Sequence, residues 1–154
     1  MSAYATAPAV FHSKALDRAA IAALVRSSGD DSPALQACFV EAIAGFAARG
    51  LAWSAGGRRI AFRLPRCVAK LPLGMEGVFA NNHERRAFHQ TLRGEAYRPV
   101  AACRVRTNAD GIPILLMRIV DPVTSSLGLP DWTLSVDCAQ VGLDRRGRLV
   151  AYDL

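Results

Sequence analysis

Long apolar runs are missing from this sequence of 154 residues. No stretch approaches the roughly 20 apolar residues that span a bilayer, and the N-terminus lacks the basic segment and uninterrupted apolar stretch of an export signal. Cys-x-x-Cys pairs are missing too: Cys38, Cys67, Cys103 and Cys138 stand far apart, with no histidine at metal-ligand spacing. The sequence therefore predicts a cytoplasmic protein with reduced thiols and no membrane partner.

Lysine is scarce, because only Lys14 and Lys70 carry it while arginine occurs seventeen times. The formal net charge of +6 thus comes almost wholly from arginine. An excess this one-sided is typical of a GC-rich genome and is weak evidence for nucleic-acid binding. Two clusters still predict basic patches, one in a hairpin (Arg58, Arg59, Arg63, Arg66) and one in a turn (Arg145, Arg146, Arg148). They would attract phosphates or an acidic protein surface, or they are solvated strand and turn residues.

The composition, 51% hydrophobic and 21% charged, is that of a globular chain long enough for one hydrophobic core. Residues 1–13 are small and Ala-rich without periodicity, which predicts a flexible N-terminal arm. Residues 14–154 are then a single α+β domain. Three histidines give no H-E-x-x-H zinc motif, so His83 and His89 are interpreted as ordinary residues of a helix surface.

Helical and alternating patterns follow one another along this domain. A helix with Ser32 as N-cap and Pro33 at its first position runs toward a stop at Gly50. Other helices are predicted over 14–26 and 76–92, and strands over 51–53, 60–64, 67–71, 100–106 and 114–120. A loop over 121–131, a weak strand over 133–136 and a C-terminal hairpin over 143–152 complete the chain. The predicted fold is an antiparallel five-stranded sheet with packed helices, plus a short C-terminal β-hairpin.

One segment carries a motif. Cys67-Val68-Ala69-Lys70 is similar to the V-A-x-K of the third strand of protein kinases, whose lysine binds the α/β-phosphates of the nucleotide. Glu84 lies fourteen residues later, in the helix where that family places the glutamate that pairs with the lysine. The order of elements also resembles a kinase small lobe. The resemblance implies a nucleotide site with Lys70 and Glu84 facing each other. The alternative is a surface lysine and an unrelated charge on the helix face.

The C-terminus extends the resemblance. The segment 148–153 is similar to the strand that ends in the metal-binding aspartate of the D-F-G motif, which implies Asp153 as that ligand. Gln140 stands thirteen residues upstream, at the spacing of the catalytic-loop asparagine. The same register places the catalytic aspartate at Ser135. Asp137 is the nearest acid, two residues out of place, and would serve as base only in a rearranged loop.

Other departures speak against catalysis. The hairpin over 52–58 has no G-x-G-x-x-G loop, although Gly56 and Gly57 can approach a phosphate. Leu154 follows the predicted metal ligand directly, so we expect no helical substrate lobe. Because phosphoryl transfer requires nucleotide, Mg²⁺ and acceptor to be positioned together, the sequence favours a non-enzymatic protein. An unrelated carboxylate cluster of Asp131, Asp137 and Asp144 for Mg²⁺ or acid/base chemistry is a further alternative.

Three functions remain open at this point. The first is a non-catalytic kinase-like interaction protein, similar to small phage or mobile-element proteins, with inhibition of a host defence complex, of the anti-CRISPR type, as its specific form; it needs a protein partner and no cofactor. The second is a small phosphotransferase or nucleotide-binding switch that uses Mg-ATP. The third is an arginine-rich nucleic-acid-binding module.

Overall fold

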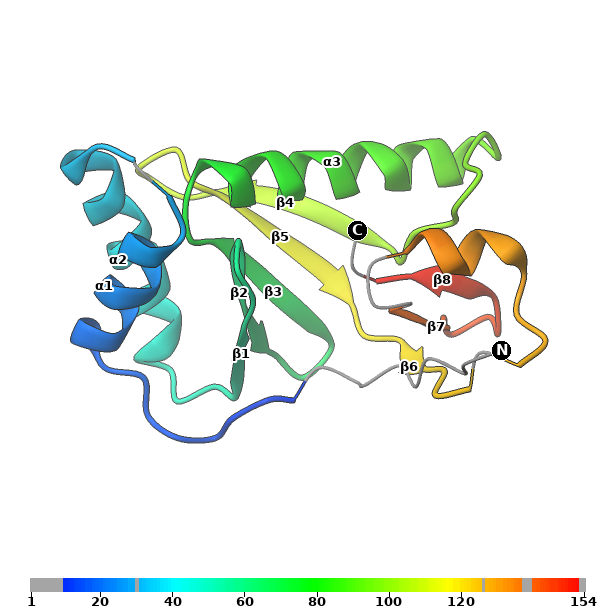
Figure 1. The fold of residues 1–154 in the computed structure, drawn as a ribbon, viewed down its shortest axis with the longest axis horizontal. Coiled ribbons are helices and arrows are strands. Elements are labelled where there is room, and N and C mark those ends of the chain that lie inside the picture. Colours follow the sequence, from blue (N-terminus) through cyan, green and yellow to red (C-terminus); the bar gives the residue numbers. More distant parts are fainter. Residues whose placement is uncertain (1–9, 30, 126, 137–139, 153–154) are drawn as a thin grey trace.

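The computed structural model describes residues 10–29, 31–125, 127–136 and 140–152. Its centre is a five-stranded antiparallel sheet with strand order β1-β2-β3-β5-β4. The strands are β1 (Trp53–Ala55), β2 (Arg59–Arg63), β3 (Cys67–Pro72), β4 (Cys103–Thr107) and β5 (Pro113–Arg118). Helices α1 (Arg18–Ser27) and α2 (Pro33–Ala47) lie at one end of the sheet, and α3 (Met75–Leu92) runs along it (Figure 1). The predicted α+β fold with an antiparallel five-stranded sheet is confirmed.

Local capping decides where α1 and α2 begin. Asp17 has an extended backbone and accepts a hydrogen bond from Ala20 N–H at 2.7 Å, so α1 begins after it rather than at residue 14 as predicted. Ser32 caps α2 through Leu35 N–H, and Pro33 occupies the first turn. Gly50 has a φ of 66°, a left-handed conformation suited to the residue after a helix. The cap and stop predicted for α2 are confirmed.

The sheet separates two apolar layers because alternate side chains point to opposite faces. One face carries Ile60, Phe62, Ala69 and Leu71, which are buried in a cluster with Ile21, Val25, Phe39 and Ile43 of α1 and α2. On the other face, Leu115 and Met117 of β5 are buried with Val100, and Ala87 and Phe88 of α3 pack against them. Helices therefore cover both faces, and α3 shares its face with the even-numbered residues of β3.

A second sheet, of order β6-β7-β8, contains the predicted C-terminal hairpin as β7 and β8 and adds one strand, β6, to it. It contains β6 (Asp121–Pro122), β7 (Val141–Leu143) and β8 (Leu149–Ala151). The loop predicted over 121–131 is therefore wrong at its start, because Asp121 pairs with Leu143. Gly142 permits this approach, since a Cβ there would lie 2.8 Å from the Asp121 carbonyl oxygen. The prediction missed β6 because a two-residue strand has no detectable alternation.

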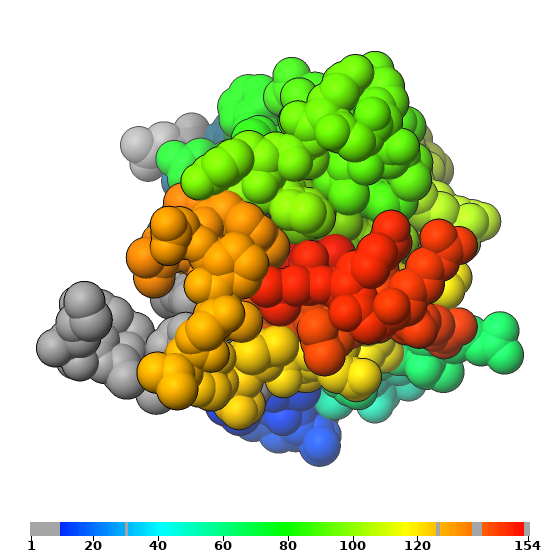
Figure 2. Space-filling view, turned by 90° about the vertical axis from the view of Figure 1, so that its right-hand side faces the viewer, coloured from blue at the N-terminus to red at the C-terminus, as the bar shows by residue number. Residues whose placement is uncertain are grey.

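The weak strand predicted over 133–136 is also wrong, because Asp131–Ser135 form a 3₁₀ helix. Both the backbone N–H and the hydroxyl of Thr133 donate to the Pro130 carbonyl, at 3.0 and 2.8 Å, and this local closure competes with an extended chain. The two sheets are joined at Val100 and Ala151, which form a parallel bridge. Val150 of β8 belongs to the same apolar cluster as Ala87 and Phe88 of α3, and Figure 2 shows the C-terminal segment (red) directly below the region of α3 (green).

Residues 1–9 of the predicted arm lie outside the described residues. Its end lies against the sheet, because His12 and Trp53 exchange backbone hydrogen bonds of 2.7 and 2.9 Å. Trp53 also donates from its indole nitrogen to the Lys14 carbonyl at 2.9 Å and packs beside the core, so its ring is not a free stacking platform. Over the described part of the chain, no helix has the length and apolar character needed to cross a bilayer.

Candidate functional site

Lys70 and Glu84 face each other in the layer between the sheet and α3. Lys70 lies on the α3 side of β3, and Glu84 lies on the inner face of α3. The lysine Nζ is 3.1 Å from one carboxylate oxygen and 3.3 Å from the other. The Glu84 side chain is 0% exposed. The predicted pairing is therefore present, and the alternative of a surface lysine and a solvated helix charge is wrong.

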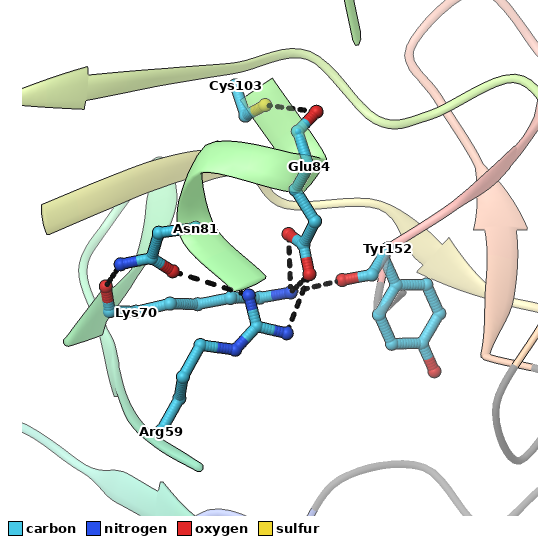
Figure 3. Close-up of polar contacts among 6 residues, drawn as sticks. All are labelled: Arg59, Lys70, Asn81, Glu84, Cys103 and Tyr152. Atoms are coloured by element: carbon cyan, nitrogen blue, oxygen red, sulfur yellow. Dashed lines mark hydrogen bonds and ion pairs between the residues drawn. The ribbon is translucent and has the colours of Figure 1, made fainter. Parts of the chain in front are cut away.

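Arg59 completes this ion pair from the neighbouring strand. Its Nη2 lies 2.6 Å from Glu84 Oε1, and its side chain is only 11% exposed. Of the two alternatives for the basic patch, the one in which Arg59 is a solvated strand residue is therefore wrong. The cause is register: Ala61 pairs with Lys70, so Arg59, two residues before Ala61, points to the same face as the lysine. Figure 3 shows the two cations converging on one carboxylate.

Asn81 fixes the position of α3 on the sheet, a role that was not predicted from the sequence. Its side chain is 0% exposed. The amide nitrogen donates to the Lys70 carbonyl at 3.0 Å and to the Pro113 carbonyl at 2.9 Å, while the amide oxygen accepts from Arg59 at 3.3 Å. Asn81 and Glu84 stand three residues apart on one helix face. In the sequence, the position of Asn81 one helical turn before Glu84 is the pattern that could have indicated this role.

The C-terminal segment reaches the same place. Lys70 Nζ donates a short hydrogen bond to the Tyr152 carbonyl, so the end of the second sheet contacts the buried lysine (Figure 3). The Tyr152 N–H donates in turn to the Gln140 carbonyl at 3.0 Å. The predicted ligand Gln140 is therefore near Lys70, on the segment that holds Tyr152. Asp137 and Asp153, the predicted base and metal ligand, lie outside the described residues.

A cleft of about 510 Å³ opens beside these residues. Its described lining includes Lys70, Tyr152 and Gln140 together with Gly56 and Gly57 of the β1–β2 turn. Five lining side chains are basic, and none of the described ones is acidic; the five are Arg58, Arg59, Arg63, Lys70 and Arg118. Apolar lining comes from Val68, Met117, Ile119 and Val120. The cleft thus combines an apolar wall with groups that bind anionic oxygens.

The basic patches are redistributed by the fold. Arg58, Arg59 and Arg63 line the cleft, whereas Arg66 is exposed and is not among the lining residues. The second predicted cluster, Arg145, Arg146 and Arg148, belongs to the β7–β8 turn and is likewise not in the lining. Arg148 lies 2.7 Å from Asp144 there. Of the seven arginines in the two predicted patches, three therefore line the cleft and four do not.

Asp144 holds the β7–β8 turn together. Its carboxylate accepts from the backbone N–H groups of Arg146 and Arg148, at 2.8 and 3.0 Å, and from Arg148 Nε at 2.8 Å. These hydrogen bonds lower the pKa of Asp144, and the bonds from Arg148 have the largest effect. Within the described residues, no three His, Cys, Asp or Glu side chains gather as metal ligands. Asp137, the third member of the predicted carboxylate cluster, lies outside those residues.

Cys103 lies behind Glu84 on β4. Its Sγ is 3.7 Å from the Glu84 carbonyl oxygen (Figure 3). Burial, and then the charge of Glu84, raises the pKa of the Cys103 thiol to about 12. The thiol therefore stays protonated at neutral pH and acts as a packing residue. Cys38, Cys67 and Cys103 are all free thiols, as predicted, and Cys138 lies outside the described residues.

The described residues of the site can bind and orient an anion, but the group predicted as general base is not among them. The nearest described candidate for a Mg²⁺ ligand is the Gln140 side chain, which lines the cleft. Comparisons with protein-family models, with curated proteins and with solved structures found no match for the chain.

Proposed function

We propose that the protein binds a nucleotide-type phosphate ligand in the cleft beside Lys70. The single observation that carries the proposal is the buried Lys70–Glu84 ion pair in the wall of a cleft of about 510 Å³. A buried carboxylate fixes the lysine in one place, and an anionic oxygen would reach the ammonium by replacing the Tyr152 carbonyl as its acceptor. The protein kinase family, which residues 67–70 resemble, uses its lysine and glutamate in this way.

The lining suits both halves of a nucleotide. Pockets for small ligands measure about 300–1,000 Å³ and combine apolar walls with a few polar groups. Val68, Met117 and Ile119 supply an apolar wall for a flat base, and Arg58 and Arg63 supply guanidinium groups for phosphate oxygens. Gly56 and Gly57 line the same cleft, and their lack of side chains allows the backbone to approach a phosphate closely. Charge, shape and backbone therefore favour the same class of ligand.

The proposal concerns binding rather than phosphoryl transfer. A kinase needs an acid that accepts the proton of the attacking hydroxyl, and Asp137 is two residues from the position that the resemblance requires. Mg²⁺, if bound with the nucleotide, would neutralise phosphate charge, and Gln140 and Asp153 are the residues proposed to hold it. The proposed function is therefore nucleotide binding without phosphoryl transfer.

Calorimetric titration tests the proposal. The protein is titrated with Mg-ATP, with ATP in EDTA and with pyrophosphate, and a thermal melt is recorded at millimolar ligand. A ligand at one hundred times its dissociation constant adds about 2.7 kcal/mol of apparent stability, which raises Tm by about 5–10 °C in a chain of this size. Lys70→Met should weaken binding at least tenfold, whereas Arg146→Met, in the remote turn, should not. Absence of heat and of any Tm shift with all three ligands would refute the proposal.

Protein binding is the second candidate, and the exposed outer face of α3 favours it. The inhibitor of a host defence complex, of the anti-CRISPR type, is the more specific form of this candidate. The nucleic-acid module has less support, because Arg59 and Arg148 of the two basic patches are held in ion pairs with Glu84 and Asp144.

A further inference from the structure

Helix α3 has an inner face that is used and an outer face that is open. Its buried residues, Gly77, Ala80, Asn81 and Glu84, face the sheet. At helical spacing, the opposite side carries the exposed residues Met75, Phe79, Arg86, Gln90 and Arg93. Figure 1 shows α3 along the upper edge of the molecule, with β4 and β5 below it. The outer stripe therefore faces solvent over the whole helix.

The N-terminal half of this stripe is apolar. Phe79 is 64% exposed and Met75 is 36% exposed. They are four residues apart, so their side chains are neighbours on the helix surface. Both side chains are more exposed than most phenylalanine and methionine side chains, which are commonly buried in the core. Exposed aromatic residues of this kind are typical anchors of protein–protein interfaces.

The C-terminal half is basic. Arg85, Arg86, His89, Gln90 and Arg93 surround a hollow of about 300 Å³. Arg93 pairs with the exposed Glu95 at 3.1 Å. Within the described ranges 10–29, 31–125, 127–136 and 140–152, no ion pair joins Arg85 or Arg86 to an acid. Arg85 and Arg86 therefore present charge to solvent, and an acidic group is their complement.

We propose that the outer face of α3 is the docking surface for a segment of a partner protein that carries apolar residues at one end and acidic residues at the other. The helix has 18 residues, which gives a face about 27 Å long. Phe79 and Met75 would contact the apolar end of the partner segment, and Arg85 and Arg86 would pair with its carboxylates. This surface is separate from the cleft, since none of these side chains lines the cleft.

The order of residue types along the stripe favours a protein over the other anionic partners. Single-stranded nucleic acid binds where arginines and aromatic residues alternate along one groove, whereas Phe79 is seven residues, about 10 Å, from Arg86. A helix that lies on a membrane has apolar residues along its full length and basic residues at its sides. Here the apolar and basic residues occupy successive halves of one stripe, which fits a segment whose own chemistry changes from end to end.

A displayed library of random 16-residue peptides is the probe for this surface. It is selected against the full chain and counter-selected against the Phe79→Asp variant, and the enriched peptides are synthesised. We expect them to contain aromatic or aliphatic residues next to Asp or Glu. Binding should protect residues 75–93 in hydrogen exchange. Phe79→Ala should weaken binding at least about tenfold, and Arg86→Ala should weaken it several-fold, with the loss shrinking as salt rises.

Tyr97→Ser is the matched control, because Tyr97 is an exposed aromatic residue beyond the end of α3 and its change should leave binding unaltered. Circular dichroism and an unchanged cleft titration show that each variant is folded, so loss of peptide binding and loss of nucleotide binding are separable. The proposal is overturned if selection enriches no acidic peptide, if protection falls outside 75–93, or if Phe79→Ala binds as the parent does. It is equally overturned if a 20-nucleotide DNA or anionic phosphatidylglycerol vesicles bind through Arg86 and Phe79.

Discussion

Replacing Glu84 by glutamine removes a charge from the centre of the site with almost no change in shape. The carboxylate has no exposed surface and lies 2.6 Å from Arg59 and 3.1 Å from Lys70. In the Glu84→Gln variant both cations stay close to a neutral amide, so their desolvation is no longer offset by this partner. Removing one member of a buried ion pair typically costs about 3–5 kcal/mol.

That loss is large relative to the stability of a domain, which is commonly about 5–15 kcal/mol. Urea denaturation followed by the fluorescence of Trp53 and Trp132 measures it directly. Glu41→Gln is the control, because the Arg18–Glu41 pair is exposed by 61% and 57%, and exposed pairs contribute little to folding. We expect a large fall in the urea midpoint for Glu84→Gln and no resolved change for Glu41→Gln. Equal midpoints in the two variants would refute the description of Glu84 as a buried carboxylate that holds two cations.

Three further predictions concern local features. Gly77→Ala should destabilise the fold by about 1–3 kcal/mol, because a Cβ there would lie 2.3 Å from the Arg58 carbonyl oxygen. Gly45→Ala should instead stabilise α2 by about 0.5–1 kcal/mol, because a Cβ at that position meets no other part of the fold within 4 Å. Urea midpoints that change in the same direction in the two variants would contradict this prediction. Cys103, with its pKa raised to about 12, should react with iodoacetamide at pH 8 far more slowly in the folded protein than in denaturing urea. Mass spectrometry of the peptide that contains Cys103 measures both rates, and equal rates would contradict the prediction. The pKa of Asp144 is lowered in the folded protein, so its carboxylate stabilises the folded state fully above the unfolded pKa of about 3.9 and stops doing so as the pH falls through the folded pKa. The stability advantage of the parent protein over Asp144→Asn should therefore vanish in acid. An advantage that stays constant with pH would contradict this prediction.

Sequence patterns identified the parts of the fold that depend on nearby residues. Ser32, Pro33 and Gly50 act through contacts within a few residues, so the ends of α2 could be predicted from them. The Lys70–Glu84 pair was predicted from the resemblance of residues 67–70 to a kinase motif and from the fourteen-residue spacing to Glu84, and the structure contains the pair.

Features that depend on pairing between distant segments were not accessible. The inward position of Arg59 follows from the register of β2 against β3, which alternation alone does not fix. Asn81 contacts the carbonyls of Lys70 and Pro113, and the second of these is reached only once β5 lies beside β3. β6 forms only by pairing with Leu143 and Gly142, twenty or more residues later in the chain. Each of these was missed because its partner is remote in the sequence.

The scarcity of lysine permits one direct measurement at the proposed site. Lys14 and Lys70 are the only lysines of the chain, so protein labelled with ¹³C at the lysine side chains gives two sets of Cε signals. Titration with Mg-ATP should shift the Lys70 signal saturably, whereas Lys14, which does not line the cleft, should stay near its starting position. A Lys70 signal that remains unmoved at millimolar Mg-ATP would contradict the claim that this cleft binds a nucleotide.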